Sequence, residues 1–413
     1  MRILTGRAAA VRVGKLANRG SQLADVEPAV ARIIADVRKR GDRALRKHAE
    51  RWDGLPSGAP LQVSEEELEA AWRSASSELK ASLRVAASNI RRFCEEQKPC
   101  AWTRKRQGIS VGQIVRPLDS VGCYVPGGRY PLVSTLLMTA IPAQVAGVAT
   151  ICIVSPQPRP EILAGAAMLG IREVYRVGGA QAVAALAYGT RSIPRVDKIV
   201  GPGNVYVTAA KKLVSFDCSI DMIAGPTEGL VVSDEGTPEF VASDLVAQSE
   251  HDPEALAVFI TTRPELARKV SAAADEMARN NRIAKQSLRR NGVILVSATR
   301  EESYGWANTL AVEHITVDAA DVGRVRNAGS IFVGDYSPQA AGDYASGPNH
   351  VLPTGAAARY RGGLSVEDFV KRISVQELSR SGLKRIAPAI ETLAVTEGLQ
   401  AHANSIRVRC AHA

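Results

Sequence analysis

The stretch DLVAQSEHDPEA, residues 244–255, ends an apolar helical pattern with several side chains that can bind metal ions. Gln248 and His251 are three residues apart, so on a helix they share one face. An amide and an imidazole on one face suit a metal ion, but they suit a solvated helix end equally well. The spacing therefore predicts either half of a metal site or an ordinary polar helix end.

The chain has six histidines, and four of them have polar neighbours of the kind that bind metals or protons. These four are His251 after Gln248, His314 after Glu313, His350 after Asp343 and His402 after Glu397. A Gln–His–Asp–His set suits zinc, which accepts nitrogen and oxygen donors. However, no spacing rule joins residues so far apart, and a lone histidine is commonplace.

Glu313 and His314 stand at the start of the apolar stretch HITV, where we expect a strand. A carboxylate next to an imidazole can supply two separate bases to one reaction. The alternative is a strand end with a salt link at the surface.

Two glycine-rich turns follow expected strands, VGGAQA at 177–182 and VGPGNVY at 200–206. Each places backbone N–H groups at a helix start, which suits a phosphate or a dinucleotide. Neither is the GxGxxG fingerprint, and a plain turn between strand and helix fits as well.

The elements that must position these residues alternate between short β-branched runs and helical patterns. Such alternation predicts parallel sheets covered by helices, an α/β fold. We expect a helical N-terminal region at 1–110, an α/β lobe at 111–235 and a second α/β lobe at 236–345. A loop and a helical tail should follow at 346–413. Both lobes would be Rossmann-like, with an incomplete dinucleotide fingerprint.

The net charge of +10 does not by itself indicate a nucleic-acid partner. Residues 1–53 hold 13 Lys and Arg against 6 Asp and Glu, in a pattern typical of the outer face of a helix. No aromatic interleaving or zinc-finger spacing accompanies them. We see no secretory signal and no apolar tract long enough to span a bilayer, and the six cysteines lack CxxC spacing. We therefore expect a cytoplasmic protein with neither a nucleic-acid nor a membrane partner.

Longer motifs carry a resemblance over about residues 115–405. In chain order they include VGCYVPGG, VGGAQAVAALAYGT, VDKIVGPGNVYVTAAKKLV, IDMIAGPTE, DLVAQSEHDP, EHITVD, GDYASGPNHVLPT and HANSIRV. The chain thereby resembles the histidinol dehydrogenase family. The resemblance implies a zinc enzyme that oxidises L-histidinol to L-histidine through a bound aldehyde in two NAD-dependent steps. It also implies an intertwined homodimer that exchanges its tails.

The resemblance extends to single positions. Gln248, His251 and Asp343 match the zinc ligands, and His402 would be the fourth, reaching across from the partner's tail. Glu313 and His314 match the catalytic bases, Tyr124, Gln181 and Asn204 match positions that contact NAD, and Thr227 and Glu397 match positions that contact substrate. The zinc ligands and His314 also belong to the implied substrate site, whereas His350 is assigned only to its neighbourhood.

Three departures from the family pattern bear on the substrate. Thr227 replaces the usual serine. Arg129 directly follows two glycines, at a position where the family usually has a small residue. The stretch ARYRGG at 358–363 is more basic than expected. Extra arginines favour an anionic substrate, so an enzyme of the same fold that oxidises another small alcohol, such as a sulfonated diol, is the alternative. Glu397 argues for a cationic amine, because a carboxylate pairs with it. A basic binding protein without catalytic activity is a third hypothesis.

Overall fold

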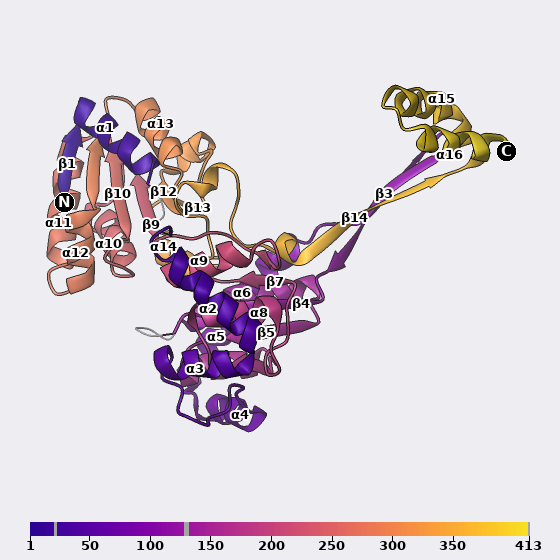
Figure 1. Ribbon diagram of the computed structural model, residues 1–413. Helices are drawn as coiled ribbons and strands as arrows, with labels where there is room; N and C mark the ends of the chain where they lie inside the picture. Colours follow the sequence, from indigo (N-terminus) through magenta and orange to yellow (C-terminus); the bar gives the residue numbers. More distant parts are fainter. Residues whose placement is uncertain (20–22, 128–131, 412–413) are drawn as a thin grey trace. The chain divides into compact units, whose positions relative to one another are not determined.

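The structure is a computed structural model that describes residues 1–19, 23–127 and 132–411 (Figure 1). Arg129, named above for its possible effect on the substrate, lies outside these residues. The chain divides into two units, which are described separately. Unit 1 comprises Met1–Gln97 and Asp119–Phe369, and unit 2 comprises Lys98–Leu118 and Val370–Ala413.

Unit 1 contains two parallel sheets. The first has five strands in the order β6-β5-β4-β7-β8. Its strands are β4 (Ser120–Tyr124), β5 (Thr150–Val154), β6 (Glu173–Tyr175), β7 (Lys198–Val200) and β8 (Ser219–Ile220). The helices that connect them are α6 (Val133–Ala146), α7 (Pro160–Met168), α8 (Gly179–Tyr188) and α9 (Val205–Val214). Short apolar strands with both faces buried are what a sheet covered by helices requires.

The second sheet has the order β1-β11-β10-β9-β12-β13, also parallel. Its strands are β1 (Arg2–Thr5), β9 (Glu228–Val232), β10 (Leu256–Thr261), β11 (Val293–Val296), β12 (His314–Val317) and β13 (Ser330–Val333). Its helices are α1 (Gly6–Ala17), α10 (Pro238–Ser249), α11 (Pro264–Met277), α12 (Arg282–Arg290), α13 (Arg300–Leu310) and α14 (Gln339–Tyr344). Figure 1 shows α1 and α13 on one face, and the apolar contacts of α10, α11 and α12 are with the other.

The remaining N-terminal helices cover the first sheet's layer. They are α2 (Glu27–Arg40), α3 (Asp42–Trp52), α4 (Glu65–Ser74) and α5 (Ser77–Glu96). Helices α2 and α3 pack on α8, α4 on α7, and α5 on α6. Gly41, at φ +52°, separates α2 from α3, because few other residues adopt that backbone conformation without strain.

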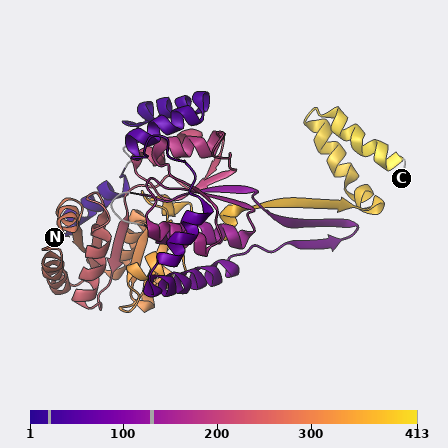
Figure 2. The same ribbon diagram turned by 90° about the horizontal axis from the view of Figure 1, so that it is seen from below.

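Unit 2 is a three-stranded antiparallel sheet followed by a helical hairpin (Figure 2). Its elements are β2 (Trp102–Arg106), β3 (Ile109–Pro117), β14 (Val370–Leu378), α15 (Arg380–Thr396) and α16 (Gln400–Ala411). The buried apolar side chains in its described part are three alanines, Ala387, Ala394 and Ala403. A unit with so small a core buries little apolar surface of its own.

The α/β class with two Rossmann-like sheets is confirmed, but the elements group differently from the predicted boundaries. β1 and α1 belong to the second sheet, not to a helical region at 1–110. β9 is a central strand of the second sheet although it lies within 111–235, and β3 belongs to unit 2. In the predicted tail, residues 346–369 belong to unit 1 and 370–378 form a strand. The cause is common to all four: a periodicity predicts a strand but not the neighbour with which it pairs.

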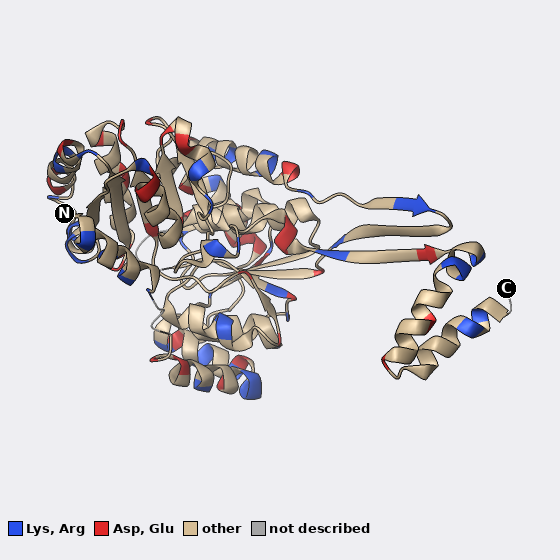
Figure 3. Ribbon diagram, turned by 90° about the horizontal axis from the view of Figure 1, so that it is seen from above, with Lys and Arg blue, Asp and Glu red and all other residues tan. Residues whose placement is uncertain are grey.

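Charged residues of both signs are interspersed over the helices (Figure 3). None of the helices in the described ranges is long and apolar enough to cross a membrane.

Candidate active site

The first sheet has the strand order of a dinucleotide-binding fold. In chain order its five strands read 3-2-1-4-5, and the order reverses between β4 and β7. Ligands of open α/β sheets bind beyond the carboxyl ends of the strands at such a reversal. Tyr124 is the last residue of β4, and Asn204 follows β7 within four residues. The topology thus brings two of the three residues predicted to contact NAD to this edge.

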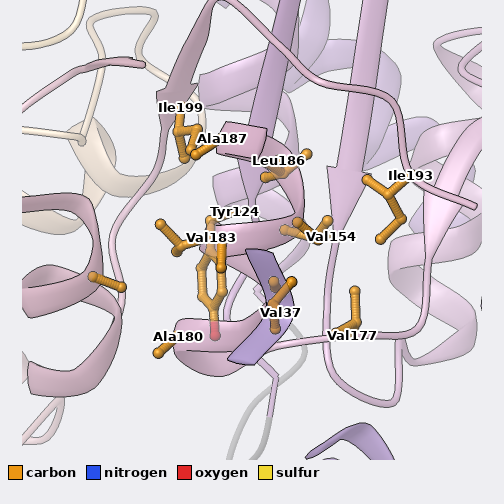
Figure 4. Packing of buried hydrophobic residues seen from close by; sticks show 14 of the residues in the cluster. Val37, Tyr124, Val154, Val177, Ala180, Val183, Leu186, Ala187, Ile193 and Ile199 are labelled. Carbon is orange, nitrogen blue, oxygen red and sulfur yellow. The ribbon is translucent and has the colours of Figure 1, made fainter. Parts of the chain in front are cut away.

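Tyr124 and Gln181 are buried beneath this edge of the sheet. Tyr124 is 4% exposed, lies among the apolar side chains of α8 and accepts a hydrogen bond from the Gly179 backbone N–H at 3.0 Å (Figure 4). Gln181 is 2% exposed, and its Nε2 donates to Asp53 Oδ2 at 3.0 Å. Burial raises the pKa of the Tyr124 hydroxyl to about 12, so this side chain is neutral. Both side chains are used in packing and hold the start of α8 in place.

Asn204 is exposed and caps α9. Its Oδ1 accepts the backbone N–H groups of Tyr206 and Val207 at 3.0 and 3.2 Å. The turn before it is rigid, because Gly201 has φ +112° and a Cβ there would lie 2.2 Å from the Tyr124 carbonyl oxygen. The buried carboxylate of Asp221 accepts the Gly201 N–H at 2.7 Å and pairs with Lys211. The N–H groups of Gly201, Tyr206 and Val207 thus already have acceptors within the protein, and these hydrogen bonds fix the turn at the start of α9.

In the second sheet the predicted chemistry lies at the opposite, amino ends of the strands. Thr227 precedes β9, Glu313 precedes β12, and His314 is the first residue of β12. Because β9 and β12 are neighbours, with His314 beside Gly229, these residues converge. Glu313 and His314 are 7% and 2% exposed, so the alternative of a surface salt link is wrong.

The Glu313 carboxylate has three close partners. Its Oε2 lies 2.6 Å from Thr227 Oγ1, accepts the Glu228 backbone N–H at 3.0 Å and lies 3.6 Å from His314 Nδ1. That last distance is too long for a hydrogen bond, and Nδ1 has no hydrogen-bond partner among the described residues. Buried polar atoms without a partner are rare in folded proteins, which singles out this nitrogen within the site.

Gln248 lies in the last turn of α10, whereas His251 lies two residues beyond the end of this helix at Ser249. Gln248 is 1% exposed, and its Oε1 position is 3.0 Å from Thr227 Oγ1. Gly229 leaves the space for this side chain, because a Cβ there would lie 2.7 Å from Gln248 Cγ. His251 is exposed, and its Nδ1 lies 3.2 Å from the carbonyl oxygen of Ala247. That contact assigns the ring proton to Nδ1 and leaves the lone pair of Nε2 available.

Asp343, on α14, joins this group from another direction. Its Oδ1 lies 3.4 Å from His314 Nε2, and the charge of His251 is close enough to contribute to lowering the Asp343 pKa. His350 Nδ1 lies 2.8 Å from the Asp343 carbonyl oxygen, and its Nε2 lies 3.2 Å from the Thr135 hydroxyl. His350 therefore positions the backbone of Asp343.

The pKa values of His314 and Asp343 are set by burial and by the opposite charges around each group. Burial alone would lower the pKa of His314, but the charges of Glu313 and Asp343 outweigh it and raise the pKa to about 10. Burial alone would raise the pKa of Asp343, and the charge and hydrogen bond of His314 lower it instead. Burial lowers the pKa of His350, which is therefore neutral at pH 7.

The donors present in unit 1 fit a zinc ion in chemical type. An amide oxygen, an imidazole nitrogen and a carboxylate oxygen are all accepted by zinc. A ligand histidine usually donates its other ring N–H to a carbonyl or carboxylate, as His251 does to Ala247. No group of three or more His, Cys, Asp or Glu in the described ranges forms a metal site on its own. Gln248, His251 and Asp343 are three donors, one fewer than the four ligands of a tetrahedral zinc site.

Glu397 and His402 both lie in unit 2. Glu397 ends α15 and His402 lies in the first turn of α16, and both side chains are exposed. Each belongs to a different unit from the other predicted ligands, so their place in the site stays a prediction.

The arginines of the 358–363 segment are bound to backbone. Arg359 donates to the Thr309 carbonyl oxygen, and Arg361 donates to that of Asp221. These contacts give the two guanidinium groups a structural role, which removes one reason to expect an anionic substrate.

Three charged residues near the site were missed from the sequence. Asp244 lies one helical turn before Gln248 and is 8% exposed. Glu228 is 3% exposed and forms a two-point ion pair with Arg19, at 2.5 and 2.6 Å. The spacing could have identified Asp244, because it lies four residues before Gln248 and therefore on the same helix face. For Arg19 and Glu228, 209 residues apart, there was none.

Several known proteins that are similar to this chain over most of its length are histidinol dehydrogenases. The family model described as histidinol dehydrogenase matches residues 16–410. The histidinol dehydrogenase of Syntrophotalea carbinolica is 47% identical over 398 residues, which cover 93% of this chain and 92% of that protein. That of Methanothermobacter thermautotrophicus is 47% identical over 414 residues, covering 96% and 97%. The crystal structure of histidinol dehydrogenase from Elizabethkingia anophelis superposes with a TM-score of 0.94 at 34% identity, covering 99% of this chain and 98% of that one.

Proposed function

The chain belongs to the histidinol dehydrogenase family, and from that premise we propose that it oxidises L-histidinol to L-histidine through a bound aldehyde. The observation that carries the proposal is the buried Glu313–His314 pair, joined by Thr227 to Gln248 and by His314 Nε2 to Asp343. Two titratable groups with different partners suit a reaction that needs two separate proton transfers. The relatives named above favour histidinol as substrate, and the alternative of a sulfonated diol has no support among them.

In this proposal His314 and Glu313 act in turn. His314 takes the proton of the substrate hydroxyl as the hydride leaves the same carbon. Glu313 then takes a proton from a water that adds to the aldehyde, which gives the hydrate for the second oxidation. The buried position of the pair keeps both groups away from bulk water, so their geometry is set by Thr227 and Asp343.

We propose that Gln248, His251 and Asp343 hold zinc together with His402 of a second copy of this chain. When bound, zinc orients the imidazole and amine of the substrate and offsets the negative charge that otherwise keeps His314 protonated. Thr227 and Glu397 are proposed to contact the substrate, Glu397 by pairing with its amine. The carbonyl contact of His251, which leaves Nε2 available, supports this assignment.

NAD is proposed to bind at the carboxyl edge of the first sheet and to accept one hydride in each of the two steps. Asn204 and the fixed turn before it would contact the cofactor, and Tyr124 and Gln181 would support it from below. The strand order, which reverses between β4 and β7, supports this position. Small-molecule biosynthesis of this kind leads us to propose a cytoplasmic location.

A homodimer with exchanged tails is proposed on the properties of unit 2. Its described part buries only three alanines as apolar side chains, while Trp102, Ile373, Leu393 and Val408 are 45%, 45%, 63% and 56% exposed. Exposed apolar surface of this extent is typical of a segment that packs against another chain. A second copy of this chain would cover it and bring Glu397 and His402 to the site.

The proposal is tested by counting product. Purified chain, supplied with zinc, excess NAD and a limiting amount of L-histidinol, should form two NADH per histidinol and yield L-histidine. A sulfonated diol under the same conditions should give no NADH above background. Turnover of the diol without turnover of histidinol would contradict the proposal.

A further inference from the structure

The hydroxyl of Thr227 lies between two oxygen positions. Its Oγ1 is 3.0 Å from the Oε1 position of Gln248 and 2.6 Å from Glu313 Oε2. A threonine hydroxyl carries one hydrogen and can donate it to only one of them. In the remaining contact Thr227 must accept a hydrogen, which comes either from a protonated Glu313 or from the amide of Gln248.

The surroundings of Glu313 decide between these sources. Its Oε2 already accepts the Glu228 backbone N–H at 3.0 Å, so this oxygen acts as an acceptor. A carboxylate oxygen has more than one lone pair and can accept the Thr227 hydrogen as well. The 2.6 Å contact is also the length typical of a hydroxyl that donates to a carboxylate. The hydrogen of Thr227 therefore points to Glu313.

Gln248 must then present its N–H to Thr227. The two ends of an amide exchange places by a half-turn, and the hydrogen-bond network decides which end lies where. With Nε2 donating to Thr227 Oγ1, the carbonyl oxygen of Gln248 faces away from Thr227. The stem of this side chain packs against Gly229, and the hydroxyl of Thr227 favours the amide orientation that places Nε2 beside it.

We infer that Thr227 is a positioning residue that leaves the carbonyl oxygen of Gln248 available to the proposed metal while it aims the carboxylate of Glu313. The inference rests on the proposed zinc site, because an amide binds zinc through its oxygen and not through its NH₂ group. One hydroxyl thus couples a metal ligand to a catalytic carboxylate 65 residues farther along the chain from that ligand (Gln248 to Glu313). The β-branched side chain of Thr227 has few rotamers, which keeps the hydroxyl in place.

Two substitutions of similar size separate the hydroxyl from its methyl group. Thr227→Val keeps the shape but neither accepts from Gln248 nor donates to Glu313, whereas Thr227→Ser keeps the hydroxyl. The zinc dissociation constant is measured for each by competition with a chelator. We expect Thr227→Val to bind zinc about 10–100-fold more weakly, the usual loss when a group that orients a ligand is removed. Thr227→Ser should stay within about threefold of the parent chain.

Thr354→Val is the matched control. Thr354 Oγ1 accepts the Gly225 N–H at 2.5 Å, so this variant also removes a buried hydroxyl, one that bonds to the backbone two residues before Thr227. It lies outside the chain of bonds to Gln248 and should leave zinc affinity within about threefold of the parent. The midpoint of urea unfolding, measured for each variant, shows whether a loss of zinc affinity is explained by a loss of folding stability.

Three results would overturn the inference. They are a Thr227→Val variant that binds zinc like the parent, a Thr227→Ser variant that loses as much as Thr227→Val, and a Thr354→Val variant that loses as much. Because the series is measured on zinc binding, a parent chain that binds zinc without oxidising histidinol contradicts the proposed function alone.

Discussion

At the scale of single residues, the site depends on two bases that differ in their partners. Glu313 is held by Thr227 and by the Glu228 backbone, whereas His314 faces Asp343. The proposed division of labour assigns hydroxyl deprotonation to His314 and water activation to Glu313. A change at one base should therefore slow one oxidation more than the other.

Glu313→Gln tests this division. The amide still accepts the Glu228 N–H but cannot take a proton from water, so formation of L-histidine should fall by about 10²–10⁴-fold. The first oxidation should persist, and the yield of NADH per histidinol should drop from two toward one. Zinc content and the products, separated by chromatography, are measured for parent and variant. A variant that still yields two NADH per histidinol at the parent rate would refute the role of Glu313.

Asp244 makes stability depend on pH. Burial, with a smaller contribution from the charge of Asp343, raises its pKa from 3.8 to about 6. A raised carboxyl pKa means that ionisation is unfavourable in the folded chain, so this penalty is absent below the unfolded pKa and complete above the folded one. Asp244→Asn should therefore raise the free energy of unfolding by about 3 kcal/mol at pH 8 and by only about 0.5 kcal/mol near pH 4. Urea unfolding in the presence of a chelator measures both values, and an equal gain at the two pH values would contradict this account.

At the scale of elements, local spacing predicted the strand that begins at His314 and the helix that carries Gln248. His251 lies two residues beyond the end of that helix, so α10 does not contain both residues of the predicted pair. Convergence of these elements was not readable from spacing, because it depends on β9 and β12 being neighbours. The same limit explains β1, whose residues pair with β11 almost 300 positions away. Arg19 and Glu228 were missed for that reason too.

The Arg19–Glu228 pair ties the N-terminal segment to the strand that starts the site. Glu228 also accepts the Gly355 N–H at 2.9 Å, so three segments meet at this carboxylate. Arg19→Ala leaves a buried charge unpaired and should lower the free energy of unfolding by about 3–5 kcal/mol at pH 7. Lys15→Ala, at an exposed position of α1, is the control and should change it by less than about 0.5 kcal/mol. Urea unfolding of both variants measures the difference, and equal small effects would show that the ion pair contributes nothing.

At the scale of the whole molecule, strands β9 to β13 repeat the strand order of the first sheet, with β1 added beside β11, and the two sheets use opposite edges. The carboxyl edge of the first sheet has the fixed turn for a dinucleotide, and the amino ends of β9 and β12 have the bases. The predicted fold class anticipated both sheets but not unit 2, whose residues 98–118 were divided between the N-terminal region and the first lobe and whose residues 370–413 were placed in a loop and helical tail. Its strand β14 was missed because alternation in the exposed stretch VKRISVQEL is not accompanied by a buried face.

The central claim is that segments of two copies of this chain build one zinc-dependent site. His251→Ala and His402→Ala are each expected to be inactive alone. Mixed and allowed to exchange subunits, they should recover about a quarter of the parent activity, because half of the dimers then contain one intact site of two. Recovery in proportion to the mixed dimer is the result this account predicts. No recovery in a mixture shown to contain mixed dimers would contradict it, since that outcome requires His251 and His402 to act within the same copy.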